Sequence, residues 1–144
     1  MENRAEILCI GTEILLGNIV NTNAQVISQG LAELGIYVYR SAVVGDNAQR
    51  LQEALEIAFA HNDIVITTGG LGPTYDDLSK ETVAAYFGLP MELHAPSEQA
   101  LRDYFARVGR PMAENNLKQA MMPKGCIVLP NPNGTAPGVI IEGT

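Results

Sequence analysis

Apolar positions along the chain alternate between short continuous runs and helical spacing. The run 5–10 predicts a buried strand, and apolar residues three or four positions apart predict a helix over 23–34 that stops at Gly35. Strands over 36–44 and 63–68 follow, with a helix carrying Leu51 to Phe59 between them and another from about Leu78 to Phe87. Strands that are apolar throughout are typical of a parallel sheet covered on both faces. The pattern therefore predicts an α/β fold with an open, mostly parallel sheet and right-handed crossovers.

The pattern changes after residue 90. Ser97 is expected to cap a helix that runs to about residue 108, and Asn115 to start a shorter helix. The runs 127–129 and 139–141 predict two strands, joined through the tight-turn pair Asn133-Gly134.

The last residues, 142–144, resemble the start of a turn that follows a strand. Residues 1–144 are expected to form one domain, because a chain of this length fits a single core, and to be a C-terminally truncated fragment of a longer chain.

Composition narrows the class of protein. With 47% apolar and 17% charged residues the chain can bury a core, and its net charge of −7 disfavours a partner that is a nucleic acid. No apolar run reaches the roughly 18 residues that a membrane span needs. The expected location is the cytoplasm, without a membrane partner. Cys9 and Cys126 each lie in a short apolar run and are expected to be core residues.

The segment 67–79 combines three glycines with two aspartates directly after a predicted strand. Glycines permit close backbone approach, and the N–H groups that start the next helix can bind an anion. The spacing is neither a Walker A loop nor Gly-x-Gly-x-x-Gly. A phosphate-binding loop and a simple turn in which Asp77 caps the helix remain equally good interpretations.

Two further loops follow strands of the same predicted sheet. Gly11-Thr12-Glu13 comes after the first strand and Gly45-Asp46 after the second, although an aspartate at that position is also the ordinary helix cap. Carboxylates gathered at one sheet edge repel each other unless a cation offsets them, and Mg²⁺ takes one or two carboxylates together with ligand phosphates. These loops predict metal-assisted attack of water on a phosphate bond.

Motifs along nearly the whole chain resemble those of the CinA family. They are Gly11-Thr12-Glu13-x-Leu15-x-Gly17 with Asn21-Thr22-Asn23, Gly45-Asp46, Thr68-Gly69-Gly70-Leu71-Gly72-Pro73-Thr74-x-Asp76-Asp77, Asn115-Asn116-x-Lys118, and Asn131-Pro132-x-Gly134-Thr135-Ala136-Pro137-Gly138. The chain is more remotely similar to the molybdopterin-binding domains of MogA and MoeA. Ser79 departs from the family, which usually has threonine there.

The resemblance implies a three-layer α/β/α domain with a mostly parallel sheet, of the molybdopterin-binding (MogA/MoeA-like) fold. It also implies hydrolysis of ADP-ribose to AMP and ribose 5-phosphate. It implies a divalent cation, Mg²⁺ or Co²⁺, helped by K⁺, and we expect a homo-oligomer. Asp77 and Asp46 are the expected catalytic residues, and Asp77, Asp76 and Asp46 the expected metal ligands. The expected substrate-binding residues are Gly11, Thr12, Glu13, Asn21, Asn23, Gly69, Gly70, Leu71, Gly72, Pro73, Thr74, Ser79, Asn115, Lys118, Gly134 and Thr135.

Two other functions remain open at this point. One is a module that binds a molybdopterin or pterin nucleotide without hydrolysing it, and the other is a degenerate domain that serves only for dimerisation. A shared fold alone does not establish which reaction a protein catalyses.

Overall fold

The computed structural model describes residues 2–143, so Thr144, the end of the predicted final turn, lies outside the described residues. The chain divides into two compact units, the first ending at Gly70 and the second beginning at Leu71. The division falls inside the glycine-rich segment. No helix within residues 2–143 is long and apolar enough to cross a membrane.

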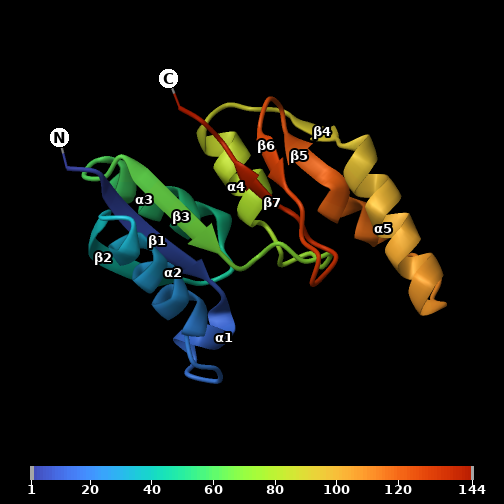
Figure 1. The fold of residues 1–144 in the computed structure, drawn as a ribbon, viewed down its shortest axis with the longest axis horizontal. Helices are drawn as coiled ribbons and strands as arrows, with labels where there is room; N and C mark the ends of the chain where they lie inside the picture. Colours follow the sequence, from blue (N-terminus) through green and yellow to red (C-terminus); the bar gives the residue numbers. More distant parts are fainter. Residues whose placement is uncertain (1, 144) are drawn as a thin grey trace. The chain divides into compact units, whose positions relative to one another are not determined.

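The first unit is built on a parallel sheet of three strands. Strands β1 (Arg4–Ile10), β2 (Tyr37–Val44) and β3 (Ile64–Thr68) take the order β2-β1-β3 (Figure 1). The helices α2 (Thr22–Glu33) and α3 (Ala48–Phe59) connect them. The prediction of a parallel α/β arrangement is confirmed, with strand and helix bounds within one or two residues of those expected.

Both faces of the central strand β1 are covered. Ile7 and Cys9 are fully buried and pack with Leu31 of α2. Leu8, also fully buried, points to the opposite face because side chains alternate along a strand. There α3 contributes the buried Leu51, and Figure 1 shows one helix on each side of the sheet. The carboxyl ends of all three strands are thereby held at one edge.

The second unit combines helices with two small antiparallel pairs. Its helices are α4 (Ser79–Tyr86), α5 (Ala95–Val108) and the 3-10 helix η1 (Glu114–Ala120). Strand β4 (Met91–Leu93) pairs with β5 (Met121–Pro123), and β6 (Ile127–Leu129) pairs with β7 (Gly138–Ile140) (Figure 1). Helix α5 packs on η1, and α4 packs on β5.

The structure contains three short elements that the sequence did not predict. The helix α1 (Thr12–Leu15) lies inside the predicted loop 11–23, and β4 and β5 have three residues each. Elements this short contain too few residues to show a periodic pattern of apolar positions, so the sequence does not reveal them.

The predicted cap at Ser97 is wrong. Helix α5 begins at Ala95, and its N-cap is His94, whose Nδ1 accepts a hydrogen bond from the Ser97 N–H at 3.3 Å. Pro96 fits the first turn because the N–H groups there have no partner within the helix.

The predicted tight turn at Asn133-Gly134 is also wrong, although the two strands do pair. The φ of Gly134 is not positive, as a two-residue hairpin turn of that kind requires. Asn131 organises a longer loop instead: its Oδ1 accepts from the Asn133 N–H, and its Nδ2 donates to the carbonyl of Ala136, both at 3.0 Å.

Candidate functional site

Glycine turns follow each strand of the first unit at the carboxyl edge of the sheet. Gly11 donates its N–H to the carbonyl of Val44 at 2.9 Å, which joins the ends of β1 and β2. Gly69 has a φ of +91°, and a Cβ there would lie 2.1 Å from the carbonyl oxygen of Ile10. Only glycine permits this approach of β3 to β1. Within this unit, the glycines that directly follow the three strands lie at this edge. The expected placement of Asp76 and Asp77 there stays a prediction, because both belong to the second unit.

Thr12 and Asp46 bind each other across two of these loops. The Thr12 N–H donates to Oδ2 of Asp46 at 3.0 Å, and the Asp46 N–H donates to Oγ1 of Thr12 at 3.1 Å. The helix cap predicted at either Asp46 or Asn47 belongs to Asn47, whose side chain accepts from the N–H of Arg50. Asp46 is therefore free of the ordinary capping role and fixes the loop after β1.

The remaining polar residues of this edge have defined positions. The exposed Glu13 carboxylate folds back over Gly11, where a Cβ would lie 2.5 Å from its Oε1. Asn21 caps α2 by accepting from the N–H of Ala24. Asn23 donates to Oγ1 of Thr68 at the end of β3, at 3.1 Å.

In the second unit, the Asp77 carboxylate lies on the backbone of residues 72–74. Its Oδ2 accepts hydrogen bonds from the Thr74 hydroxyl at 2.6 Å and the Thr74 N–H at 2.9 Å. A Cβ on Gly72 would lie 2.5 Å from the same oxygen, so glycine leaves room for the carboxylate.

These contacts favour the charged form of the Asp77 carboxyl group. Partial burial raises the pKa of Asp77, but the hydrogen bonds from Thr74 and Gly72 and the positive charge of Lys118 outweigh it, so the pKa lies below its ordinary value. Asp77 consequently stays ionised to a lower pH than an ordinary aspartate does.

Asp77 is not the cap of the following helix. The N-cap of α4 is Leu78, which makes no side-chain capping bond, while the Asp77 side chain points back to Thr74. The helix cap expected at Asp77 is therefore wrong, and the phosphate-binding loop stays a prediction. Ser79, the first residue of α4, is buried, and Gly70 adopts a φ of +66°.

Lys118 ties η1 to this loop. Its ammonium donates to the carbonyl of Thr74 at 2.9 Å and to the carbonyl of Asp77. Asn115, on the same 3-10 helix, is exposed. Of these two predicted substrate-binding residues, Lys118 is the one that contacts the loop bearing Asp77.

Gln119 is a residue of this unit that the sequence did not indicate. It is 3% exposed, and its Nε2 donates to Oγ1 of Thr135 at 2.9 Å. Within residues 2–143 its buried Oε1 accepts no hydrogen bond, and an unpaired buried acceptor costs about 1–3 kcal/mol. Gly134 lies against Asn131, with 3.1 Å between its ideal Cβ position and Nδ2. The predicted Gly134-Thr135 pair is thus held by Asn131 and Gln119.

The donors for a cation are carboxylates that belong to separate units. Asp46 is in the first unit, and Asp76 and Asp77 are in the second. Among the described residues, no three His, Cys, Asp or Glu side chains form a group that could hold a metal ion. The ionised Asp77 nevertheless suits Mg²⁺, which needs only one or two carboxylates when ligand phosphates and water complete its shell.

Comparison with known proteins gives the family. Residues 6–144 match the family described as "probable molybdopterin binding domain". A competence-damage inducible protein of Clostridium novyi (strain NT) is 60% identical over 139 residues, which are 96% of this chain and 34% of that protein. The crystal structure of CinA from Thermoplasma acidophilum, a protein of unknown function, is 36% identical with a TM-score of 0.83, over 96% of this chain and 80% of that one. The chain belongs to the CinA family.

The CinA-type domain shares its fold with a more distant group. MoaB of Pyrococcus furiosus, a tungsten cofactor synthesizing protein, is 21% identical with a TM-score of 0.55, over 75% of this chain and 66% of that one. At that identity the likeness shows the fold alone. The chain spans about a third of the length of the curated CinA relatives it matches, 34% for the protein of C. novyi.

Proposed function

We propose that the chain hydrolyses ADP-ribose to AMP and ribose 5-phosphate with a divalent cation, Mg²⁺ or Co²⁺, assisted by K⁺. Membership of the CinA family supports this activity, together with the motif resemblance of the loops at 11–13, 45–46 and 68–77. We also infer a free small nucleotide in the cytoplasm as the substrate, since a net charge of −7 repels nucleic acids.

The ionised carboxylate of Asp77 carries the proposal. It lies on a glycine-containing loop beside Thr74, whose hydroxyl and N–H stabilise the charged form, the form that can accept a proton from water. In the reaction one water adds to a phosphorus of the diphosphate, the bridging P–O bond breaks, and a proton is released. Asp77 orients the water and takes that proton, while Lys118 fixes the loop by binding its carbonyls.

Of the three expected ligands, Asp76 and Asp77 of the second unit would hold the cation, and the expectation for Asp46 stays a prediction. When bound, the cation supplies positive charge that offsets the charge developing on the phosphate oxygens.

Binding of a molybdopterin or pterin nucleotide without hydrolysis is the second candidate. The family description and the fold shared with MoaB favour it. It requires the same loops to hold a nucleotide, but no carboxylate that takes a proton.

One assay separates the two candidates. The chain is incubated with ADP-ribose and Mg²⁺ or Co²⁺, with and without K⁺, and AMP is measured by chromatography beside calorimetric binding. We expect AMP, and a loss of about 10²-fold or more in turnover for Asp77→Asn. Asp63→Asn is the control, because Asp63 also accepts a main-chain hydrogen bond, from Arg4 at 3.3 Å, outside the proposed site. Binding without AMP would favour the second candidate.

A further inference from the structure

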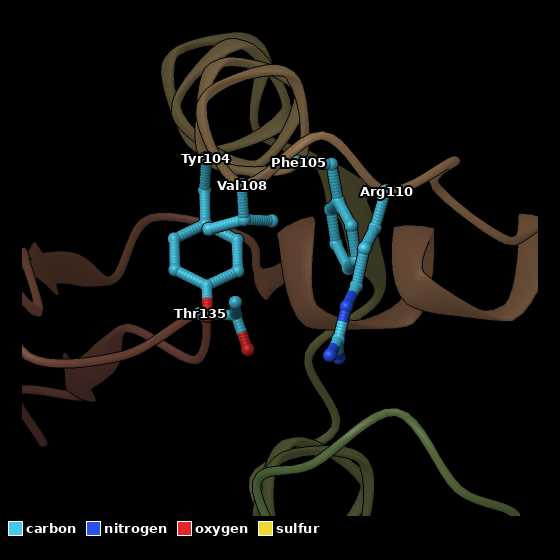
Figure 2. Close-up of a pocket in the computed structure, with 5 residues that line it drawn as sticks. All are labelled: Tyr104, Phe105, Val108, Arg110 and Thr135. Carbon is cyan, nitrogen blue, oxygen red and sulfur yellow. The ribbon is translucent and has the colours of Figure 1, made fainter.

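A cavity of about 500 Å³ lies in the second unit, beside the C-terminal half of α5. It is lined by Tyr104, Phe105, Val108, Arg110 and Thr135. Figure 2 shows the two rings projecting from the helix, with the Arg110 guanidinium and the Thr135 hydroxyl on the side away from it. Its volume is in the range of small-molecule sites.

Arg110 brings an uncompensated positive charge to this cavity. Within residues 2–143, no carboxylate lies within ion-pair distance of its guanidinium; the same holds for Arg4 and Arg107, whereas Arg40, Arg50 and Arg102 each pair with a glutamate. Of the three arginines without an ion pair, Arg110 is the one that lines this cavity. In a chain with 16 acidic and 9 basic residues, acidic partners are plentiful. An unpaired guanidinium offers forked donors that match the oxygens of a phosphate.

Thr135 supplies a second donor. Its Oγ1 accepts a hydrogen bond from the buried Gln119, so the proton of the hydroxyl is left to donate elsewhere. Because the Gln119 side chain is buried, it holds the hydroxyl in a fixed position. The cavity therefore presents a guanidinium and a positioned hydroxyl to one ligand.

The rest of the wall is apolar and aromatic. Tyr104 and Phe105 meet edge to face, with 5.5 Å between ring centroids, and Arg107 covers Tyr104 at 5.8 Å from its centroid. A second cavity, of about 990 Å³, shares Tyr104 and Thr135 with the first and continues along α5. The combined space suits an elongated ligand that has a flat apolar part and an anionic part.

We propose that this cavity binds a nucleoside monophosphate group, with the phosphate on Arg110 and Thr135 and the base against Tyr104, Phe105 and Val108. This assignment rests on the proposed function, because Thr135 is among the expected substrate-binding residues. It adds Arg110 and Tyr104, which lie outside every motif of the family resemblance, as residues that select the nucleotide half of the substrate.

Calorimetric titration of AMP into the 144-residue chain without added metal tests the site apart from hydrolysis. Adenosine and inorganic phosphate are titrated in parallel. Wild-type protein should bind AMP more tightly than either fragment. Arg110→Gln should weaken AMP binding about tenfold or more, the loss expected when a charged hydrogen bond is removed. Tyr104→Leu should weaken AMP and adenosine but not phosphate.

Arg102→Gln is the matched control, because Arg102 lies on the same helix but pairs with Glu98 at 2.7 Å and does not line the cavity. It should leave the AMP affinity unchanged. Equal AMP affinity in wild type and Arg110→Gln, or no AMP binding at millimolar concentration, would overturn the assignment. Binding that depends on Arg110 in a chain without ADP-ribose turnover would support the site and reject only the proposed hydrolysis.

Discussion

The Thr74 hydroxyl and the Asp77 carboxylate form a 2.6 Å hydrogen bond across a single turn of backbone, and the Thr74 N–H donates to the same oxygen. The Asp77 N–H in turn donates to the Thr74 carbonyl at 3.2 Å. This reciprocal arrangement closes the loop ahead of α4 and stabilises the charged form of Asp77.

Replacing Thr74 should therefore shift the pH dependence of the proposed hydrolysis. Asp77 must be ionised to accept a proton, and its lowered pKa keeps activity present to a lower pH than an ordinary aspartate would. Thr74→Val removes the hydroxyl donor, so the pKa of Asp77 rises and the acidic limb of the rate profile moves to higher pH. The measurement is kcat/KM against pH. Thr74→Ser keeps a hydroxyl, so the acidic limb of its pH–rate profile should coincide with that of the wild type. Coincident profiles for the wild type and both variants would contradict this role for Thr74.

The sequence was sufficient to predict the three strands and the two long helices of the first unit, because their signals are local. The apolar run 5–10 marks a central parallel strand, and Gly11 and Gly69 directly follow the strands whose ends they join. A parallel sheet then brings such loops to one edge without further information.

The second unit depends on contacts that have no such local signal. Gln119 reaches Thr135 across sixteen positions, and the prediction offered no reason to pair them. Asp77 satisfied the pattern of a capping residue and that of a loop residue equally well, and only the direction of its side chain separates the two. Ser97 is of a residue type that often caps helices, whereas the true cap, His94, is not.

The two cysteines should behave differently, contrary to the expectation that both are core residues. Cys9 is fully buried in β1, whereas Cys126 precedes β6 and is only half buried. Cys9→Ala should lower the free energy of unfolding by about 1 kcal/mol or more, and Cys126→Ala by less, as a partly exposed position loses little packing. Thermal melts check this, and both variants should retain ADP-ribose turnover because no thiol takes part.

Thiol labelling provides an independent check on Cys126. Partial burial raises the pKa of its thiol, against the opposing effects of its own backbone N–H and of Lys80. The reactive thiolate is thus scarce at neutral pH, and labelling of native protein should be slower than of the unfolded chain. Rapid labelling at neutral pH would show that the thiol is ionised after all.

Buried Lys80 should make stability depend on pH. Its ammonium donates to the carbonyls of Gln119 at 3.1 Å and Met121 at 2.7 Å. Burial lowers its pKa; Glu81 and Cys126 oppose this, and Lys118 adds to it. Between the lowered pKa and the ordinary one, the unfolded chain binds more protons than the folded chain, so the free energy of unfolding rises with pH.

Lys80→Met should lack this rise. Urea unfolding from neutral pH to about 10.4, the ordinary pKa of lysine, should show a stability difference between wild type and Lys80→Met that grows with pH. Lys124→Met is the control, because Lys124 is exposed and its removal should leave a difference that does not grow. A constant difference for Lys80→Met would mean that folding does not lower the pKa of Lys80.

Three glycines should respond to alanine in three distinct ways. At Gly69 the new Cβ would lie 2.1 Å from the backbone oxygen of Ile10, and relieving this clash would require the main chain of β1 or of the loop to move. At Gly88 the φ of +67° is strained for alanine, but nothing lies within 4 Å of the Cβ. At Gly72 the nearest atom is Oδ2 of Asp77, at 2.5 Å, the end of a side chain that can move.

Gly72→Ala should therefore act on chemistry more than on folding. The methyl group displaces the Asp77 carboxylate from Thr74, so turnover should fall toward that of Asp77→Asn while the melting temperature changes little. Gly69→Ala should lose the most stability. Gly88→Ala should lose about 1–2 kcal/mol of stability, the cost of a left-handed backbone conformation in a residue other than glycine, and should keep normal turnover. Parallel melts and AMP assays on the three variants give the comparison. Full turnover in Gly72→Ala would mean that the position of Asp77 on the loop does not matter, and the proton acceptor would then have to be sought at Asp46 or Asp76.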